Sequence, residues 1–182
     1  MNKFIFTLIT ICSFSMLKAQ NDTVYFDSSW QETNKENASF YRLPLTVTGT
    51  GYLLLDFYIS GAKQFEGVTT DPESETYQGV ATWYYENGKT EQVANYENGI
   101  RQGEFLNYDK QGNLVAKGIY KDDSPFEGSF TQMSDYYIQI SKYENGQLIN
   151  AESYDPTGKS KAKVLIVVTD KELQNGEIEY YN

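Results

Sequence analysis

The sequence predicts an all-β fold: an antiparallel meander of stacked β-hairpin repeats that forms a single-layer or weakly curled sheet. Glycine recurs after 24 and then 25 residues, at Gly79, Gly103 and Gly128, and self-similarity at such a period is typical of repeat proteins. Inside this repeat, three steps from glycine to tyrosine are each eight residues long: Gly88 to Tyr96, Gly112 to Tyr120 and Gly146 to Tyr154. The chain also has 16 tyrosines, and tyrosine favours a pleated, half-buried strand.

The first 19 residues predict an export signal. Lys3 gives a basic start, Phe4 to Leu17 is apolar, and Leu17-Lys18-Ala19 suits signal-peptide cleavage. The apolar stretch is about fourteen residues, whereas a membrane-spanning helix needs about twenty. We therefore expect cleavage after Ala19 and export of the mature chain to the periplasm, the outer surface or the medium, without membrane insertion.

The mature chain divides into an arm and a repeat domain. Residues 20–38 are polar with isolated aromatics, and we expect an N-terminal arm there with one edge strand near Val24–Phe26. Residues 39–182 form the β-hairpin repeat domain, and we expect about eleven or twelve strands in all. The first strands of this domain are expected at 43–47, 51–59 and 64–68, where β-branched and aromatic runs lie between turn residues.

Asn-Gly pairs predict where the hairpins turn. They occur at 87–88, 98–99, 145–146 and 175–176, and Gln111-Gly112 stands at the equivalent place in the second repeat. A type I′ turn needs positive φ at both central residues, which Asn and Gly tolerate best. We therefore expect type I′ turns at these positions, with one hairpin in each repeat.

Composition excludes several classes of function. The net charge is −10, and loss of Lys3 and Lys18 with the signal would make it about −12, so the surface repels the phosphates of nucleic acid. Histidine is absent, and Cys12 inside the signal is the only cysteine, which excludes Ser/His/Asp and Cys/His catalysis and the usual zinc sites. The acidic loops lack the ligand spacing of a calcium loop. We expect no cofactor, no metal and no nucleic-acid partner.

A pair of carboxylates is the enzymatic alternative that remains, as in glycoside hydrolysis. Glu86 and Glu97 precede Asn-Gly turns, as Glu144 does, so a repeated structural position accounts for them. With 25 acidic residues in the chain, we favour a solvated role for these carboxylates and expect no catalytic residue. The candidates for such a pair are Glu73, Glu75, Glu86, Glu97, Glu104 and Glu127.

Aromatic side chains are the better candidates for binding. Strand alternation places Trp83 and Tyr85 on one face and Tyr84 on the other. In a single-layer sheet one row of such rings stays exposed, where it could stack on sugar rings or contact a protein. The alternative is that the rings form cross-strand pairs that only stabilise the sheet. The candidate ligand-binding residues are Trp83, Tyr84, Tyr85, Tyr96, Tyr108 and Tyr120.

Three segments resemble the MORN repeat variant seen in many bacterial proteins: 85–89 (YENGK), 96–103 (YENGIRQG) and 108–114 (YDKQGNL). The resemblance covers residues 77–128 and is partial over 143–158. It implies stacked antiparallel hairpins that act as structural or interaction modules, without enzymatic activity.

The main functional hypothesis is therefore an exported, non-enzymatic β-repeat module for protein or glycan interaction at the cell envelope. One alternative is a carboxylate-based glycan hydrolase. Another is a purely structural envelope component, which would have no saturable ligand.

Overall fold

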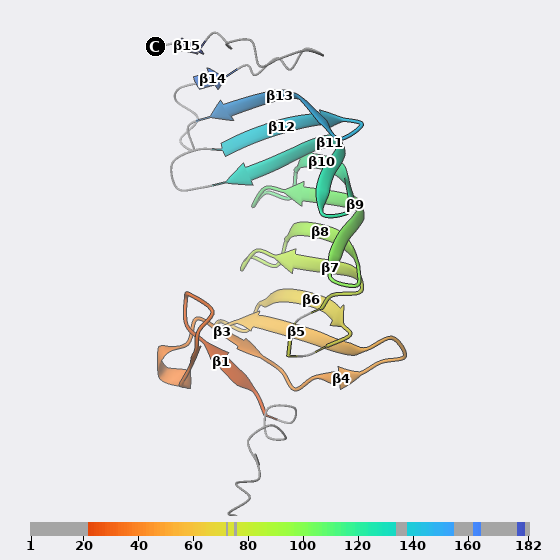
Figure 1. Cartoon of the computed structure of the whole chain (residues 1–182). Coiled ribbons are helices and arrows are strands. Elements are labelled where there is room, and N and C mark those ends of the chain that lie inside the picture. The colour runs from red at the N-terminus through yellow and green to blue at the C-terminus, as the bar shows by residue number, and fades with distance from the viewer. Residues whose placement is uncertain are drawn as a thin grey trace, which may run out of the picture.

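The computed structural model describes residues 22–71, 73–74, 76–133, 138–154, 162–164 and 178–180. The expected export signal and the Asn-Gly pair at 175–176 lie outside these residues. The described residues form fifteen strands and one short 3-10 helix, η1 (Lys35–Asn37) (Figure 1). No helix among them is long and apolar enough to cross a membrane. The strands are β1 (Val24–Phe26), β2 (Glu32–Thr33), β3 (Phe40–Arg42), β4 (Thr46–Val47), β5 (Tyr52–Tyr58), β6 (Lys63–Thr69), β7 (Gly79–Tyr84), β8 (Thr90–Glu97), β9 (Ile100–Tyr108), β10 (Leu114–Lys121), β11 (Ser124–Met133), β12 (Ile138–Glu144), β13 (Gln147–Tyr154), β14 (Ala162–Val164) and β15 (Ile178–Tyr180).

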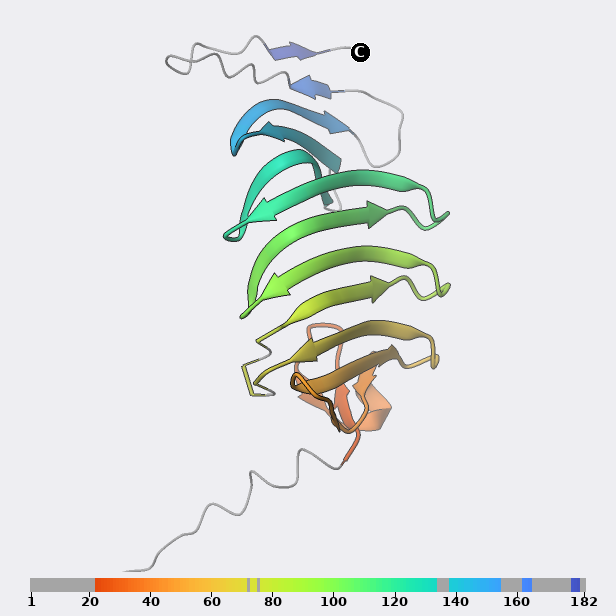
Figure 2. The same cartoon turned by 90° about the vertical axis from the view of Figure 1, so that its right-hand side faces the viewer.

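Thirteen of the described strands form one antiparallel sheet, in the order β13-β12-β11-β10-β9-β8-β7-β6-β5-β3-β1-β2, with β4 also paired to β5. From β5 to β13 each strand pairs with the next one in the chain, so the strands stack as a ladder (Figure 2). The predicted all-β antiparallel meander is confirmed. The strand number exceeds the expected eleven or twelve because residues 24–47 contribute four short strands.

Part of the expected N-terminal arm belongs to the sheet. β1 pairs with β2 on one side and with β3 on the other. Its pairing with β3 sets Tyr25 opposite Tyr41, and their ring centroids lie 6.2 Å apart. The strand expected near Val24–Phe26 is therefore present, although β2 rather than β1 stands at the end of the strand order.

Pro44 interrupts the strand expected at residues 43–47. Two short strands stand there instead: β3 ends at Arg42, β4 begins at Thr46, and both pair with β5. Proline has no N–H to donate to a ladder, so the bounds predicted for this strand are wrong. The strands expected at 51–59 and 64–68 are confirmed as β5 and β6.

Two-residue turns join successive hairpins along one edge of the sheet. Asn98-Gly99 has φ of 52° and 81°, and Asn145-Gly146 has φ of 51° and 78°. Both pairs thus have the two positive φ angles of the predicted type I′ turn. Asp122-Asp123 turns in the same way, with φ of 50° and 65°, although no glycine marks this turn.

Each of these turns is bonded to the hairpin before it by the same two hydrogen bonds. The second turn residue donates its N–H to a backbone carbonyl: Gly99 to Tyr77 (2.8 Å), Asp123 to Arg101 (3.1 Å) and Gly146 to Phe126 (2.7 Å). The first turn residue donates its N–H to the side-chain oxygen of the following position: Asn98 to Gln78 (3.0 Å), Asp122 to Gln102 (2.8 Å) and Asn145 to Glu127 (3.2 Å). The sequence repeat of 24 and 25 residues is the spacing of these acceptors.

Three-residue turns form the opposite edge, so the type I′ turn expected at Asn87-Gly88 is wrong. Of these two residues only Gly88 has positive φ, 81°. The Gly88 N–H donates to the Tyr85 carbonyl, and the Tyr85 N–H donates to the Lys89 carbonyl. This pattern is a type I turn followed by a left-handed bulge residue. The turn at 109–113, which contains Gln111-Gly112, has the same two bonds.

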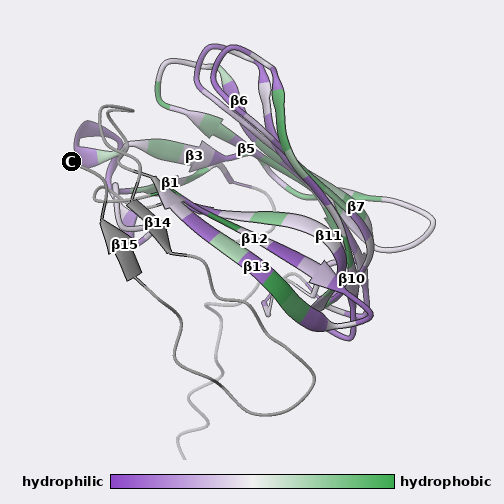
Figure 3. Cartoon of the chain, turned by 90° about the horizontal axis from the view of Figure 1, so that it is seen from above, coloured by the Kyte–Doolittle hydropathy of each residue, from purple (hydrophilic) through white to green (hydrophobic). Residues whose placement is uncertain are grey.

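The core lies on one face of the sheet, which we call the inner face. The strands bend around this face (Figures 2 and 3), and the bend lets a single sheet enclose side chains. Small residues stand beside large ones on neighbouring strands, as where Phe105 pairs with Ala94 and with Gly118. The buried apolar residues are Leu54, Phe65, Ala81, Ala94, Phe105, Ala116, Phe130 and Ala151.

Two repeat glycines inside strands have similar backbone conformations but different surroundings. Gly103 and Gly128 have φ of 86° and 93°. A Cβ on Gly103 would meet no atom closer than 3.9 Å, whereas a Cβ on Gly128 would lie 2.4 Å from the Lys117 carbonyl oxygen. We expect Gly103→Ala to lower the free energy of unfolding by about 1 kcal/mol through left-handed strain alone. Gly128→Ala should lower it by about 3 kcal/mol because β10 must also shift.

Urea denaturation of the two variants measures these losses. The Gly103→Ala variant is the matched control, since it carries the same strain without the steric clash. Equal losses of unfolding free energy in the two variants would contradict the predicted clash between a Cβ at position 128 and the Lys117 carbonyl oxygen.

Candidate functional site

Three of the six aromatic residues predicted to bind a ligand lie on the inner face. Trp83 and Tyr96 pack against both clusters of buried residues. Tyr120 packs against one of them, with its ring centroid 4.9 Å from that of Phe130. Burial raises the pKa of the Tyr96 and Tyr120 hydroxyls. These rings therefore stabilise the fold, whatever else they contact.

The other three predicted residues lie near the edge of three-residue turns. The Lys63 ammonium lies 5.5 Å from the centroid of the Tyr84 ring. The Tyr85 hydroxyl donates to the backbone carbonyl of Tyr108 (2.8 Å). The structure thus distributes the six residues between the core and one edge and does not gather them in one row.

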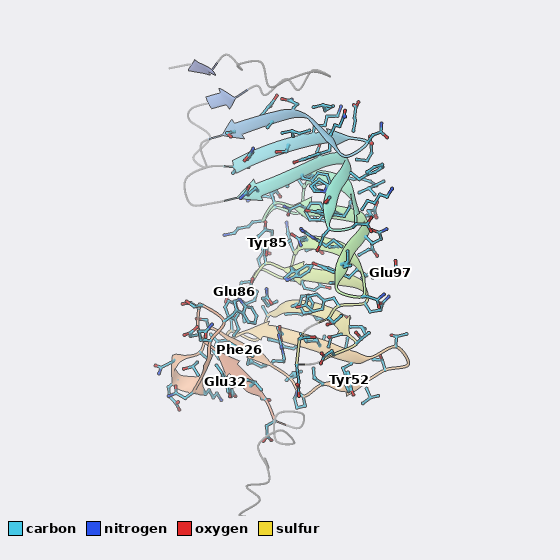
Figure 4. All side chains as sticks on the ribbon, viewed as in Figure 1. Phe26, Glu32, Tyr52, Tyr85, Glu86 and Glu97 are labelled. Atoms are coloured by element: carbon cyan, nitrogen blue, oxygen red, sulfur yellow. The ribbon has the colours of Figure 1, made fainter. Side chains whose placement is uncertain are left out.

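The inner face contains a cavity of about 330 Å³ near the N-terminal end of the sheet. We call it the first cavity. Its volume lies at the lower end of the range of small-molecule sites. Trp83 is the one sequence-predicted residue in its wall, and Figure 4 labels Phe26, from β1. The lining residues are Phe26, Trp30, Arg42, Asp56, Gln64, Phe65, Tyr77 and Trp83, five of them aromatic.

Polar groups in the first cavity are held in fixed positions. Arg42 donates from Nε to Oδ1 of Asp56 (2.7 Å) and from Nη2 to Oδ2 (2.8 Å), and Asp56 is only 2% exposed. Such a bidentate pair orients both side chains. The side-chain oxygen of Gln64 is buried and accepts no hydrogen bond from the described residues. The cavity therefore combines aromatic walls with an oriented Arg42–Asp56 pair.

Trp30 lines the first cavity from a turn that uses glycine elsewhere in the sheet. Its N–H donates to the Asp27 carbonyl (3.1 Å), and the Asp27 N–H donates to the Gln31 carbonyl (2.9 Å). These are the bonds of the three-residue turns described above, in which Gly88 and Gly112 hold the equivalent place. Trp30 nevertheless has φ of 58°, a conformation that costs a non-glycine residue about 1 kcal/mol or more. Its ring stacks on Phe40 at 4.5 Å and remains 39% exposed.

A second cavity, of about 490 Å³, lies at the edge of three-residue turns. Figure 4 labels Tyr85 and Glu86 at this edge, opposite Glu97. Tyr58 and Tyr85 begin equivalent turns, and the Tyr58 hydroxyl donates to the Tyr84 carbonyl (2.9 Å) as the Tyr85 hydroxyl does to that of Tyr108. The lining residues are Tyr58, Tyr85, Glu86, Asn87 and Lys110.

Glu91 is a half-buried carboxylate near the second cavity. It has no hydrogen bond or ion pair within the part of the chain that the structure describes. Burial raises the pKa of Glu91, and the charge of Lys110 partly offsets that rise. The pKa values of the Tyr58 and Tyr85 hydroxyls are also raised, first by burial and then by the negative charge of Glu91. Glu91 is not among the candidate residues predicted from the sequence.

The carboxylates considered for glycan hydrolysis have other surroundings. Glu104 forms an ion pair with Lys117 (2.7 Å), and Glu127 accepts the turn bond from Asn145. Glu86 and Glu97 lie on opposite edges of the sheet (Figure 4), and Glu75 is outside the described residues. Among the residues that the structure describes, no group of three His, Cys, Asp or Glu side chains could hold a metal ion.

Replacing Glu91 by glutamine should stabilise the fold near neutral pH. Because burial raises the folded-state pKa of Glu91 above its unfolded value, its contribution to stability is complete below the unfolded pKa and is lost as the pH rises through the folded pKa. We expect Glu91→Gln to raise the free energy of unfolding at pH 7 by about 0.5 kcal/mol, allowing for solvent screening. The gain should vanish in acid.

Urea denaturation across the pH range measures this gain. Glu104→Gln is the matched control, because it removes the same charge from an exposed ion pair. A Glu91→Gln gain that does not grow with pH would contradict the assigned effect of burial.

Comparison with known proteins gives one positive result. A family model described as MORN repeat variant matches residues 77–98 and 101–122. Each match covers one hairpin, β7 with β8 and β9 with β10, together with the first residue of the two-residue turn that follows. A search of curated proteins and a search of solved structures each found no match. The resemblance to the MORN repeat variant is therefore confirmed over residues 77–98 and 101–122.

Proposed function

We propose that the chain is an exported, non-enzymatic β-repeat module that binds one sugar ring of a cell-envelope glycan in its first cavity. The observation that carries the proposal is Trp30. A tryptophan stands where equivalent turns use glycine, in a left-handed conformation that is unfavourable for it. Its ring is partly exposed and lines a cavity. Binding explains why the side chain is kept there.

The chemistry of the first cavity favours a hydroxyl-bearing ring. Sugar rings have apolar C–H faces that stack on aromatic side chains, and five aromatic residues line the cavity. Sugar hydroxyls both donate and accept hydrogen bonds, and three polar residues, Arg42, Asp56 and Gln64, stand in the same wall. The volume of about 330 Å³ suits one ring rather than a broad protein interface.

The same cavity supports binding over hydrolysis. Hydrolysis of a glycosidic bond uses two carboxyl groups on either side of that bond. Asp56 is the one carboxylate among the residues that line the first cavity, and Arg42 holds both of its oxygens. Among the described residues, the wall has no second carboxylate. One group would therefore have to act both as the acid and as the base or nucleophile.

Export is the part of the proposal that rests on the sequence. The basic, apolar and small-residue segments of residues 1–19 have the order of a signal peptide. We accordingly propose a glycan partner in the cell envelope or outside the cell.

Two substitutions of Trp30 separate binding from stability. Both Trp30→Ala and Trp30→Gly should weaken glycan binding at least about tenfold, because the stacking ring is lost. Trp30→Gly should nevertheless be more stable than Trp30→Ala by about 1 kcal/mol, because glycine adopts the left-handed turn without strain. Screening on a glycan array, followed by calorimetry on the best ligand and urea denaturation, measures both effects.

Ile119→Ala, a change at an exposed side chain of β10, is the control and should bind as the unmodified chain does. Absence of any glycan ligand on the array would sink the glycan assignment. Trp30-dependent capture of a protein would support the binding role and replace the glycan by a protein partner. Release of reducing sugar from a bound glycan would favour the hydrolase.

Export predicts a defined mature terminus. When the full chain is expressed with its own signal in a bacterial host, we expect intact-mass analysis of the exported fraction to show a chain that begins at Gln20. Replacing Ile9 by arginine should interrupt the apolar segment and leave the full-length chain in the cytoplasm. A full-length exported product would contradict cleavage after Ala19.

A further inference from the structure

We propose that the second cavity is a binding site for an alkylammonium cation, such as an amine or the side chain of a lysine. The site lies at the edge of three-residue turns and is separate from the proposed sugar site. Its walls combine two tyrosine rings with the carboxylate of Glu86. The carboxylate of Glu91, which has no ion pair among the residues that the structure describes, lies close enough to act on both tyrosine hydroxyls. Aromatic faces and carboxylates together are the surroundings that attract ammonium groups.

The ring of Tyr85 already attracts a cation from its own chain. The Lys110 ammonium lies 6.0 Å from the centroid of that ring, and Lys110 also lines the cavity. Its backbone is fixed, because the Asn87 side-chain amide donates to the Lys110 carbonyl (2.8 Å). The long side chain of Lys110 can therefore move aside for an incoming ammonium while the turns keep their positions.

Charged groups of both signs surround the second cavity. Glu86 and Lys110 line it, and the carboxylates of Glu91 and Asp109 act on the Tyr85 hydroxyl. The Lys89 ammonium donates to the Gln111 carbonyl beside Lys110. Glu86 and Glu91 have no ion pair among the described residues, so both carboxylates can attract an added ammonium. The net charge of −10 for the chain acts in the same direction at longer range.

The placement of Glu91 results from a β-bulge. Trp83 pairs with Gln92 and Tyr84 pairs with Thr90, so Glu91 is the extra residue of β8. Gln64 is the extra residue of β6 in the preceding hairpin, because Asp56 pairs with Phe65 and Phe57 pairs with Lys63. Bulges re-aim a side chain. Gln64 shows that this bulge position accepts a neutral side chain. The fold therefore does not require the charge of Glu91.

The test uses the full chain and n-butylammonium, which reproduces the end of a lysine side chain. Calorimetry at low salt should show saturable binding of n-butylammonium and none of n-butanol, which has the same length without the charge. Glu91→Gln should weaken binding at least about tenfold. Glu104→Gln removes an equal charge at a distant ion pair with Lys117 and should change the affinity less than about twofold.

Tyrosine variants separate the ring from the hydroxyl. Tyr85→Leu should abolish binding, because the aromatic face is lost. Tyr85→Phe keeps the face and should bind nearly as well, although it loses the hydrogen bond to Tyr108. Lys110→Gln should bind n-butylammonium more tightly. Thermal unfolding of each variant shows whether it is folded, and Glu91→Gln is expected to be at least as stable as the unmodified chain.

A pentalysine peptide distinguishes the source of the ammonium. If n-butylammonium competes with pentalysine and the acetylated peptide does not bind, the site takes the lysine side chain of a protein. If n-butylammonium binds and pentalysine does not, the site takes a free amine. Equal weakening by Glu91→Gln and Glu104→Gln, binding of n-butanol, or no saturable binding of n-butylammonium would each overturn the proposal.

Discussion

The fold depends on the pair of hydrogen bonds by which each two-residue turn holds the hairpin before it. A lone hairpin is marginally stable in water, and these bonds join one hairpin to the next outside the strand ladder. The backbone acceptors belong to Tyr77, Arg101 and Phe126, so the side chain at that position is free to vary. The side-chain acceptor must be a long chain ending in oxygen, and Gln78, Gln102 and Glu127 all meet this need. The period seen in the sequence records this constraint.

Local sequence predicted the hairpins better than it predicted their turns. Asn98-Gly99 and Asn87-Gly88 are the same dipeptide, yet only the first forms the expected type I′ turn. The two turns differ in length: two residues separate the paired residues Glu97 and Ile100, whereas three separate Tyr85 and Lys89. The dipeptide itself does not determine this length. Asp122-Asp123 makes a type I′ turn with no glycine, because the Asp123 carboxylate accepts bonds from the backbone and guanidinium of Arg101. Tertiary contacts override local propensity there.

The candidate site was only partly predictable, because alternation along a strand does not say which face the fold covers. Trp83, Tyr96 and Tyr120 all pack against the core, since the bend of the sheet encloses the face they share. Of the three, Trp83 also lines the first cavity. Most residues of the first cavity come from separate strands, and no local sequence pattern shows that these residues meet in the fold. One signal was present: the segment DSSW at 27–30 has the form of DKQG at 109–112, with tryptophan in place of glycine.

A residue that the local backbone does not favour lines the first cavity, and another lies beside the second. Trp30 holds a left-handed turn position, and Glu91 holds a half-buried charge without a partner among the described residues. At each place an equivalent turn or bulge carries a residue without that strain or that charge, Gly88 in one case and Gln64 in the other. Repeats make this comparison possible inside one chain, because equivalent positions share the same backbone. When stability favours one residue and the chain carries another, the local loss of stability is best explained by function.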